Sequence, residues 1–214
     1  MTEAEWLACD DPARLVRALQ SNAGRAKAKA PERKLRLFTC ACSRQEWGRL
    51  THATSRHAVE VAERFVEGGA TRGELAAACD DVTIERQAGK IGFAPSWLAY
   101  TDRVAADFLG QPRRDWGRAS AARQADLLRE LVGNPFQRVR LLRAWLTPTV
   151  TCLAAAAYQE RSLPSGELER ARLGILADAL EEAGCNRPAL LGHLRSAGPH
   201  VRGCWALDLI LGRA

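Results

Sequence analysis

The sequence predicts an all-α fold, a compact single-domain bundle of roughly ten short-to-medium helices around a central apolar helix. Apolar residues recur at the 3.6-residue spacing of amphipathic helices along most of the chain, and no stretch alternates clearly as a strand would. Glycine, proline and capping residues divide the chain into segments of helical length. Residues 35–47 are apolar around nearly the whole circumference of a helix, which is typical of a helix wrapped by others.

The first two helices are predicted by their capping residues. Thr2 and Glu5 have the spacing of a capping box, which opens a helix through Cys9. Asp11 then serves as the N-cap of a second helix, with Pro12 at its first position. A basic connector over residues 22–34 is expected to lead from that helix into the central one, which is entered at Pro31.

The remaining elements follow the same signals. Thr54 or Ser55 is expected to cap one helix, and Thr71 with Glu74 forms a second capping box for the next. Residues 111–119 are expected to form a surface loop or insertion. Further helices are predicted over residues 56–66, 72–79, 96–109, 120–132, 139–146, 149–161, 166–183, 188–194 and 200–211.

The composition indicates a globular protein and gives no sign of a membrane-spanning or secreted one. With 47% hydrophobic residues in 214, the chain can bury a real core, and its 26% of charged residues is ordinary for a globular protein. No apolar run approaches the length of a membrane span, and the first residues lack the features of a signal peptide, so we expect a cytoplasmic protein without membrane contact. The seven cysteines include no C-x-x-C pair and are expected to be buried, reduced hydrophobes.

Much of the formal charge of +6 is local and suggests a class of partner. Residues 25–36 carry six basic side chains and one acidic one, and residues 113–118 carry three arginines around a tryptophan. Such clusters bind nucleic-acid phosphates and acidic protein surfaces alike, although a solvated loop with a half-buried tryptophan is the simpler interpretation of the second cluster. The candidate partner-binding or nucleic-acid-binding residues are Arg25, Lys27, Lys29, Arg33, Lys34, Arg36, Arg113, Arg114, Trp116 and Arg118.

The only constellation with a chemical implication lies near the C-terminus. On a helix over residues 200–211, His200, Cys204 and Asp208 would share one face, as two metal ligands or as a His–Cys pair. Cys185 and His193 could complete a four-ligand zinc site. Because no two of these cysteines have the close spacing of structural zinc modules, we expect core cysteines instead, with His200 bonded to a backbone group and Asp208 paired with an arginine.

No catalytic residue and no cofactor are predicted. The sequence holds no glycine-rich phosphate loop, no G-x-S-x-G elbow and no H-E-x-x-H motif. The sequence therefore gives enzymatic activity no positive support.

Several stretches resemble an uncharacterised bacterial family that occurs as many paralogues in large GC-rich genomes. The similar stretches span nearly the whole chain, and they are residues 1–9, 33–38, 58–64, 133–136, 176–185 and 198–205. The resemblance implies no activity, cofactor or catalytic residue. Multiplication into paralogues suits an adaptor or recognition module better than a metabolic enzyme.

Together these observations predict a non-enzymatic helical module, an adaptor or accessory subunit of a bacterial complex, that binds a protein partner. The alternative is an accessory subunit that binds nucleic acid through residues 25–36 and 113–118. The third hypothesis is a small zinc- or thiol-dependent enzyme built on His200 and Cys204.

Overall fold

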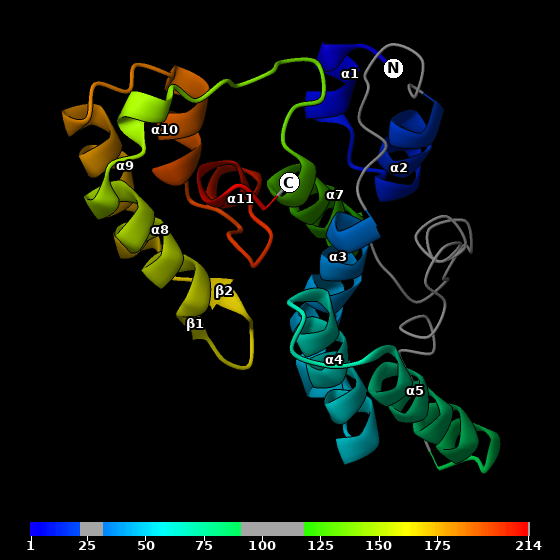
Figure 1. Ribbon diagram of the computed structural model, residues 1–214. Helices are drawn as coiled ribbons and strands as arrows, with labels where there is room; N and C mark the ends of the chain where they lie inside the picture. The colour runs from blue at the N-terminus through cyan, green and yellow to red at the C-terminus, as the bar shows by residue number, and fades with distance from the viewer. Residues whose placement is uncertain (22–31, 91–117, 214) are drawn as a thin grey trace.

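The computed structural model describes residues 1–21, 32–90 and 118–213, and these form an all-α protein with one two-stranded sheet (Figure 1). The predicted fold class is therefore confirmed. The predicted helix over residues 96–109 lies outside the described residues, as do residues 22–31 of the basic connector and residues 111–117 of the predicted loop.

The first helices begin where their capping residues predict. The Thr2 hydroxyl accepts a hydrogen bond from the Glu5 amide at 3.2 Å, and the Glu5 carboxylate accepts one from the Thr2 amide at 2.7 Å. This capping box starts α1 (Glu3–Ala8). The Asp11 carboxylate caps α2 (Pro12–Ser21) by accepting from the Ala13 amide at 2.9 Å.

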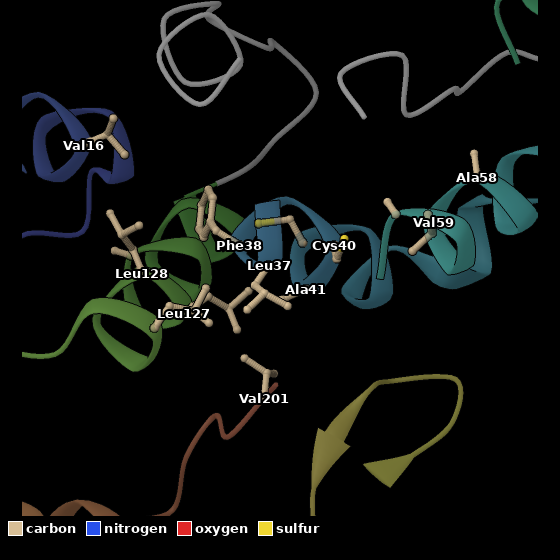
Figure 2. Close-up of a cluster of buried hydrophobic side chains, with 14 of the residues drawn as sticks. Val16, Leu37, Phe38, Cys40, Ala41, Ala58, Val59, Leu127, Leu128 and Val201 are labelled. Atoms are coloured by element: carbon tan, nitrogen blue, oxygen red, sulfur yellow. The ribbon is translucent and has the colours of Figure 1, made fainter. Parts of the chain in front are cut away.

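The central helix of the sequence prediction is α3 (Glu32–Gln45). Leu37, Phe38 and Cys40 on it are each no more than 3% exposed. Figure 2 shows Leu37 and Phe38 close to Leu127 and Leu128 of α7 (Arg118–Val132), which packs along α3. Because α3 is covered on several sides, its sequence has to be apolar nearly all round.

The buried hydrophobic residues form two clusters, which define two lobes (Figure 1). The N-terminal lobe comprises α1, α2, α3, α7 and three further elements: η2 (Trp47–Arg49), α4 (Ala53–Val66) and α5 (Arg72–Gln87). The C-terminal lobe comprises η4 (Arg143–Trp145), α8 (Pro148–Gln159), β1 (Arg161–Ser162), β2 (Glu167–Leu168), α9 (Arg170–Glu182), α10 (Pro188–Leu194) and α11 (Trp205–Leu211).

The helix for which Thr54 or Ser55 was the predicted cap begins earlier, at Ala53. Three other predicted helices differ more strongly from the structure. Residues 161–168 form a hairpin, with a turn at Gly166 (φ +76°), so α9 begins only at Arg170. Residues 138–142 are not helical and lead into the short 3-10 helix η4. Residues 200–204 form a loop, because Gly203 adopts a positive φ of 86° that a helix does not allow, so the last helix begins at Trp205.

A buried ion-pair network around Glu63 joins the N-terminal lobe to strand β1 of the C-terminal lobe. Glu63 of α4 accepts hydrogen bonds from Arg44 of α3 at 2.9 and 2.7 Å, and from Arg161 of β1 at 2.8 and 2.7 Å. Burial alone would raise the pKa of the Glu63 carboxyl, but the two guanidinium groups outweigh burial and lower that pKa below its ordinary value.

Substitution Glu63→Gln is therefore expected to cost about 2–3 kcal/mol of stability at pH 7, because two arginines lose their buried counter-charge. A carboxyl whose pKa is lowered by folding stabilises the protein above its unfolded pKa of about 4.3, and that contribution disappears as the pH falls through the folded pKa. Urea unfolding of the wild type and Glu63→Gln between pH 7 and pH 3 should show their difference in stability becoming smaller as the pH falls.

The control is Glu169→Gln, which changes an exposed carboxylate paired with Arg172 and should differ little in stability from the wild type at every pH. A difference for Glu63→Gln that stays constant with pH would contradict the charge-based explanation.

Candidate functional site

Four side chains that can each donate a ligand atom to a metal converge where the two lobes meet. The donor cluster consists of Glu130 of α7, His193 of α10, and His200 and Cys204 of the loop before α11, and its ligand atoms all lie within 4.8 Å of one another. His193 Nε2 lies 3.2 Å from a Glu130 carboxylate oxygen and 3.2 Å from Cys204 Sγ. His200 Nδ1 lies 3.4 Å from the other Glu130 oxygen.

The loop that carries His200 and Cys204 depends on two glycines with positive φ. A Cβ at Gly198 (φ +92°) would lie 2.9 Å from the His200 amide nitrogen, and one at Gly203 (φ +86°) would lie 2.4 Å from Leu37 Cδ1. Only glycine fits such positions, where the backbone is left-handed and in close contact with its surroundings. The turn at Gly203 therefore places Cys204 against the central helix while keeping it at the start of α11.

The donor cluster is largely buried. Glu130, His200 and Cys204 are at most 4% exposed, and the His193 side chain is 17% exposed. Burial and the neighbouring Glu130 carboxylate raise the pKa of the Cys204 thiol well above its ordinary value. Burial also raises the pKa of the Glu130 carboxyl, but hydrogen bonds with His193 and His200 outweigh it and lower that pKa.

A cavity of about 710 Å³ lies against the donor cluster. Glu130 and His193 form part of its wall, and Trp6 and Trp205 contribute aromatic surface from opposite lobes. Val139 also lines the cavity, from the segment that crosses between the lobes (Figure 1). The cavity is therefore an inter-lobe feature with a mixed apolar and polar lining.

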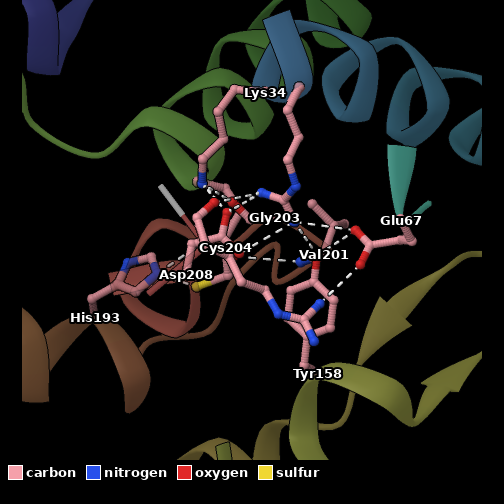
Figure 3. A network of polar contacts seen from close by, with 11 residues as sticks. Lys34, Glu67, Tyr158, His193, Val201, Gly203, Cys204 and Asp208 are labelled. Carbon is pink, nitrogen blue, oxygen red and sulfur yellow. Dashed lines mark hydrogen bonds and ion pairs between the residues drawn. The ribbon is translucent and has the colours of Figure 1, made fainter. Parts of the chain in front are cut away.

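A second polar network joins the lobes beside the donor cluster (Figure 3). Asp208 of α11 accepts from Arg33 at 2.6 Å and pairs with the ammonium of Lys34 at 2.5 Å. Arg33 also donates to Tyr158 at 2.6 Å, and the Tyr158 hydroxyl donates to Glu67 at 2.7 Å. Burial lowers the pKa of Lys34, an effect that the Asp208 charge only partly offsets. Both cations thus serve contacts within the fold.

Of the residues that the sequence proposed for metal binding, His193, His200 and Cys204 are brought together, and Cys185 is not among the four donors. The expected helix face shared by His200, Cys204 and Asp208 is wrong, since two of these residues lie in a loop. The expectation for His200 itself fits, because its Nε2 lies 3.3 Å from the Ser196 carbonyl oxygen. Asp208 pairs with an arginine, as expected, and this arginine is Arg33; it also pairs with Lys34.

The candidate basic residues whose side chains the structure describes do not form an exposed connector, as the sequence predicted, but lie on α3. Residues 32–34, the end of the predicted connector, begin α3 instead. Arg33 and Lys34 pair with Asp208, and Arg36 pairs with Glu32 and lies over the Phe65 ring. The side chain of Arg118 at the start of α7, and the residues Arg25, Lys27, Lys29, Arg113, Arg114 and Trp116, lie outside the described residues.

Two structural features of the junction between the lobes were not predicted from the sequence. Glu130 lies three residues after Leu127 on α7, and an acid at helical spacing from a fully buried leucine is a signal of a buried partner. The arginine connector, residues 137–143, overlaps the helix predicted over residues 139–146. The alternation of Arg138, Val139 and Arg140 between exposed and partly buried positions has the period of an extended strand.

The fold and site define an all-α protein of two helical lobes with a buried Glu/His/His/Cys cluster at their junction. No protein-family model, curated protein or solved structure matches the chain. Among the described residues, no helix combines the length and the hydropathy that a membrane span requires.

Proposed function

We propose that this chain is a non-enzymatic interaction module that binds an acidic, extended segment of a partner protein on the arginine connector. The observation that carries this function is the side-chain pattern of the connector. Arg138 and Arg140 are exposed while Val139 and Leu141, between and after them, are partly buried. Within the described part of the chain, neither of these arginines nor Arg143 has an ion-pair partner.

The backbone of the connector supports an extended partner. Between residues 138 and 142, no amide N–H donates to any group of the described residues. An extended segment with free backbone groups can accept a peptide as an added strand, where main-chain hydrogen bonds give affinity and side chains give specificity. Unpaired arginines on the exposed side select a peptide rich in glutamate or aspartate.

The inter-lobe cavity supports an apolar anchor within that peptide. Val139 of the connector forms part of the cavity wall, together with Trp6 and Trp205. Interfaces gain most of their affinity from a few apolar or aromatic side chains seated in such pockets, with charged residues around them. The expected ligand is therefore acidic on one face and apolar on the other.

The two competing functions have less support. The nucleic-acid alternative relied on the basic tract, in which Arg33, Lys34 and Arg36 are engaged in intramolecular ion pairs. The third hypothesis, an enzyme that uses the Cys204 thiol, has little support because this side chain is fully buried and its pKa is raised, so little thiolate is available to a substrate.

Fluorescence anisotropy with a labelled peptide tests the proposed function. The probe is an eight-residue peptide of alternating glutamate and valine that ends in tryptophan. Reversing two charges with Arg138→Glu and Arg140→Glu is expected to weaken binding on the order of tenfold, about 1.4 kcal/mol.

The matched control carries Arg17→Glu and Arg72→Glu, which make the same change in net charge on exposed residues of α2 and α5. Its affinity should stay within about twofold of the wild type. Absence of peptide binding, or equal weakening by both pairs of substitutions, would contradict the proposal. Tighter binding of a labelled single-stranded oligonucleotide than of the peptide would favour the nucleic-acid alternative instead.

A further inference from the structure

We propose that Glu130, His193, His200 and Cys204 bind one Zn²⁺ ion in a closed, tetrahedral site that links the two lobes. Zinc bonds of about 2.0–2.3 Å at tetrahedral angles hold ligand atoms about 3.3–3.8 Å apart. The separations in the donor cluster are 3.2 Å for His193 to Glu130, 3.2 Å for His193 to Cys204 and 3.4 Å for His200 to Glu130. These three separations, two of them to different Glu130 oxygens, are close to the spacing that the ion imposes, and all the ligand atoms lie within 4.8 Å of one another.

Hydrogen bonds outside the cluster orient two of the ligands. His200 Nε2 lies 3.3 Å from the Ser196 carbonyl oxygen, which can only accept, so Nε2 carries the proton and Nδ1 turns toward the cluster. Glu130 accepts from the Val201 amide at 3.4 Å. Metal-binding histidines and carboxylates usually have such outer partners, which fix the tautomer and the orientation of the ligand.

Ion pairing alone explains the arrangement less well. His193 presents a single nitrogen, Nε2, at 3.2 Å from both a Glu130 oxygen and Cys204 Sγ. One N–H bond cannot point straight at two acceptors in different directions, whereas a cation between the four atoms is bonded to all of them. In a metal-free cluster Cys204 hydrogen-bonds the Glu130 carboxylate, whereas a bound cation would engage its sulfur together with the other three ligand atoms.

The donor chemistry selects the metal. Thiolate with imidazole favours zinc over magnesium or calcium, which prefer oxygen ligands. Four protein ligands leave no open position for a substrate, which is the pattern of a structural site. Glu130 and His193 line the inter-lobe cavity, which gives the ion a path of entry.

The position of the site gives it a structural role. Glu130 belongs to α7 of the N-terminal lobe, and the other three ligands belong to α10 and to the loop that leads into α11. Zinc would therefore fix the distance between the lobes and the shape of the cavity between them. The zinc site depends on the donor cluster alone, so it can be tested without a peptide ligand, and its failure would not contradict the proposed function.

Metal analysis and cobalt substitution of the full-length protein test the site. Protein purified from zinc-supplemented cells is expected to contain about one zinc ion per chain, measured by inductively coupled plasma mass spectrometry. After chelation and titration with Co²⁺, the wild type should develop the visible bands of tetrahedral cobalt and a thiolate-to-cobalt charge-transfer band.

Substitutions within the donor cluster are compared with substitutions of the same residue types outside it. Cys204→Ser should remove the charge-transfer band, and His193→Asn should weaken Co²⁺ binding at least about a hundredfold. Cys185→Ser and His57→Asn change the same residue types outside the cluster and should leave the spectrum unchanged. Circular dichroism checks that each variant is folded. Folded wild-type protein without stoichiometric zinc and without cobalt bands, or a charge-transfer band that survives Cys204→Ser, would overturn the proposal in favour of a hydrogen-bonded ion-pair cluster.

Discussion

In zinc-replete buffer, a strong chelator is expected to lower the midpoint of thermal unfolding of the wild-type protein by roughly 10–15 °C. An ion that binds only the folded state, at a concentration about a thousand times its dissociation constant, adds about 4 kcal/mol of stability. The donor cluster exists only when α7, α10 and the loop before α11 are in place. Loss of the ion therefore weakens the contact between the lobes.

The control for this prediction is the same chelation of His193→Asn. This variant lacks one ligand, so its midpoint should already be lowered and should change little when the chelator is added. Differential scanning calorimetry of both proteins, with and without chelator, measures the four midpoints. An equal change in wild type and variant would show that the chelator acts elsewhere.

Substitution Asp208→Ala is expected to cost about 3–5 kcal/mol of unfolding free energy, because it removes the counter-charge of Lys34 within a buried network. Lys34 is 7% exposed and Asp208 is 1% exposed, so water would make up only part of the interaction lost with the carboxylate. The ammonium keeps its contact with the Gly203 carbonyl oxygen at 2.5 Å, which does not neutralise its charge. Urea denaturation at pH 7 measures the loss.

Two further variants isolate the cause. Asp178→Ala removes a carboxylate that pairs with Arg195 at the surface, and it should cost no more than about 1 kcal/mol. Combining Asp208→Ala with Lys34→Met should recover at least about 1 kcal/mol relative to Asp208→Ala, because no uncompensated ammonium then stays buried. Simple addition of the two single losses would contradict this explanation.

The two inter-lobe networks and the donor cluster join the lobes in the same way. Each brings a charged or ligating group of the N-terminal lobe to one of the C-terminal lobe: Glu63 to Arg161, Lys34 to Asp208, and Glu130 to His193. Polar groups buried in this way specify one arrangement of the lobes, because any other arrangement leaves them unsatisfied. The cavity and the arginine connector depend on that arrangement.

The sequence by itself determined the helical class, the central helix and most helix starts. These features depend on local signals: the capping boxes at Thr2 and Thr71, proline at the start of α8, and the apolar circumference of α3. Such signals act within a few residues and do not depend on the rest of the fold.

The sequence also indicated part of the donor cluster, but for a geometric reason that proved wrong. His200 and Cys204 were expected to meet on one helical face, whereas they meet because a loop with left-handed glycines folds back against α3 and α7. Spacing along the chain cannot distinguish these two routes to the same contact.

Only the tertiary structure decided the rest. Glu130 lies 63 residues before His193 in the sequence and reaches it because α7 packs against α11 and the loop that precedes it. Arg33 and Lys34 read as part of an exposed basic tract, yet they are partners of Asp208, 174 residues beyond Lys34. Whether a charged side chain meets water, a partner protein or a buried carboxylate depends on contacts between distant segments, and no local pattern carries that information.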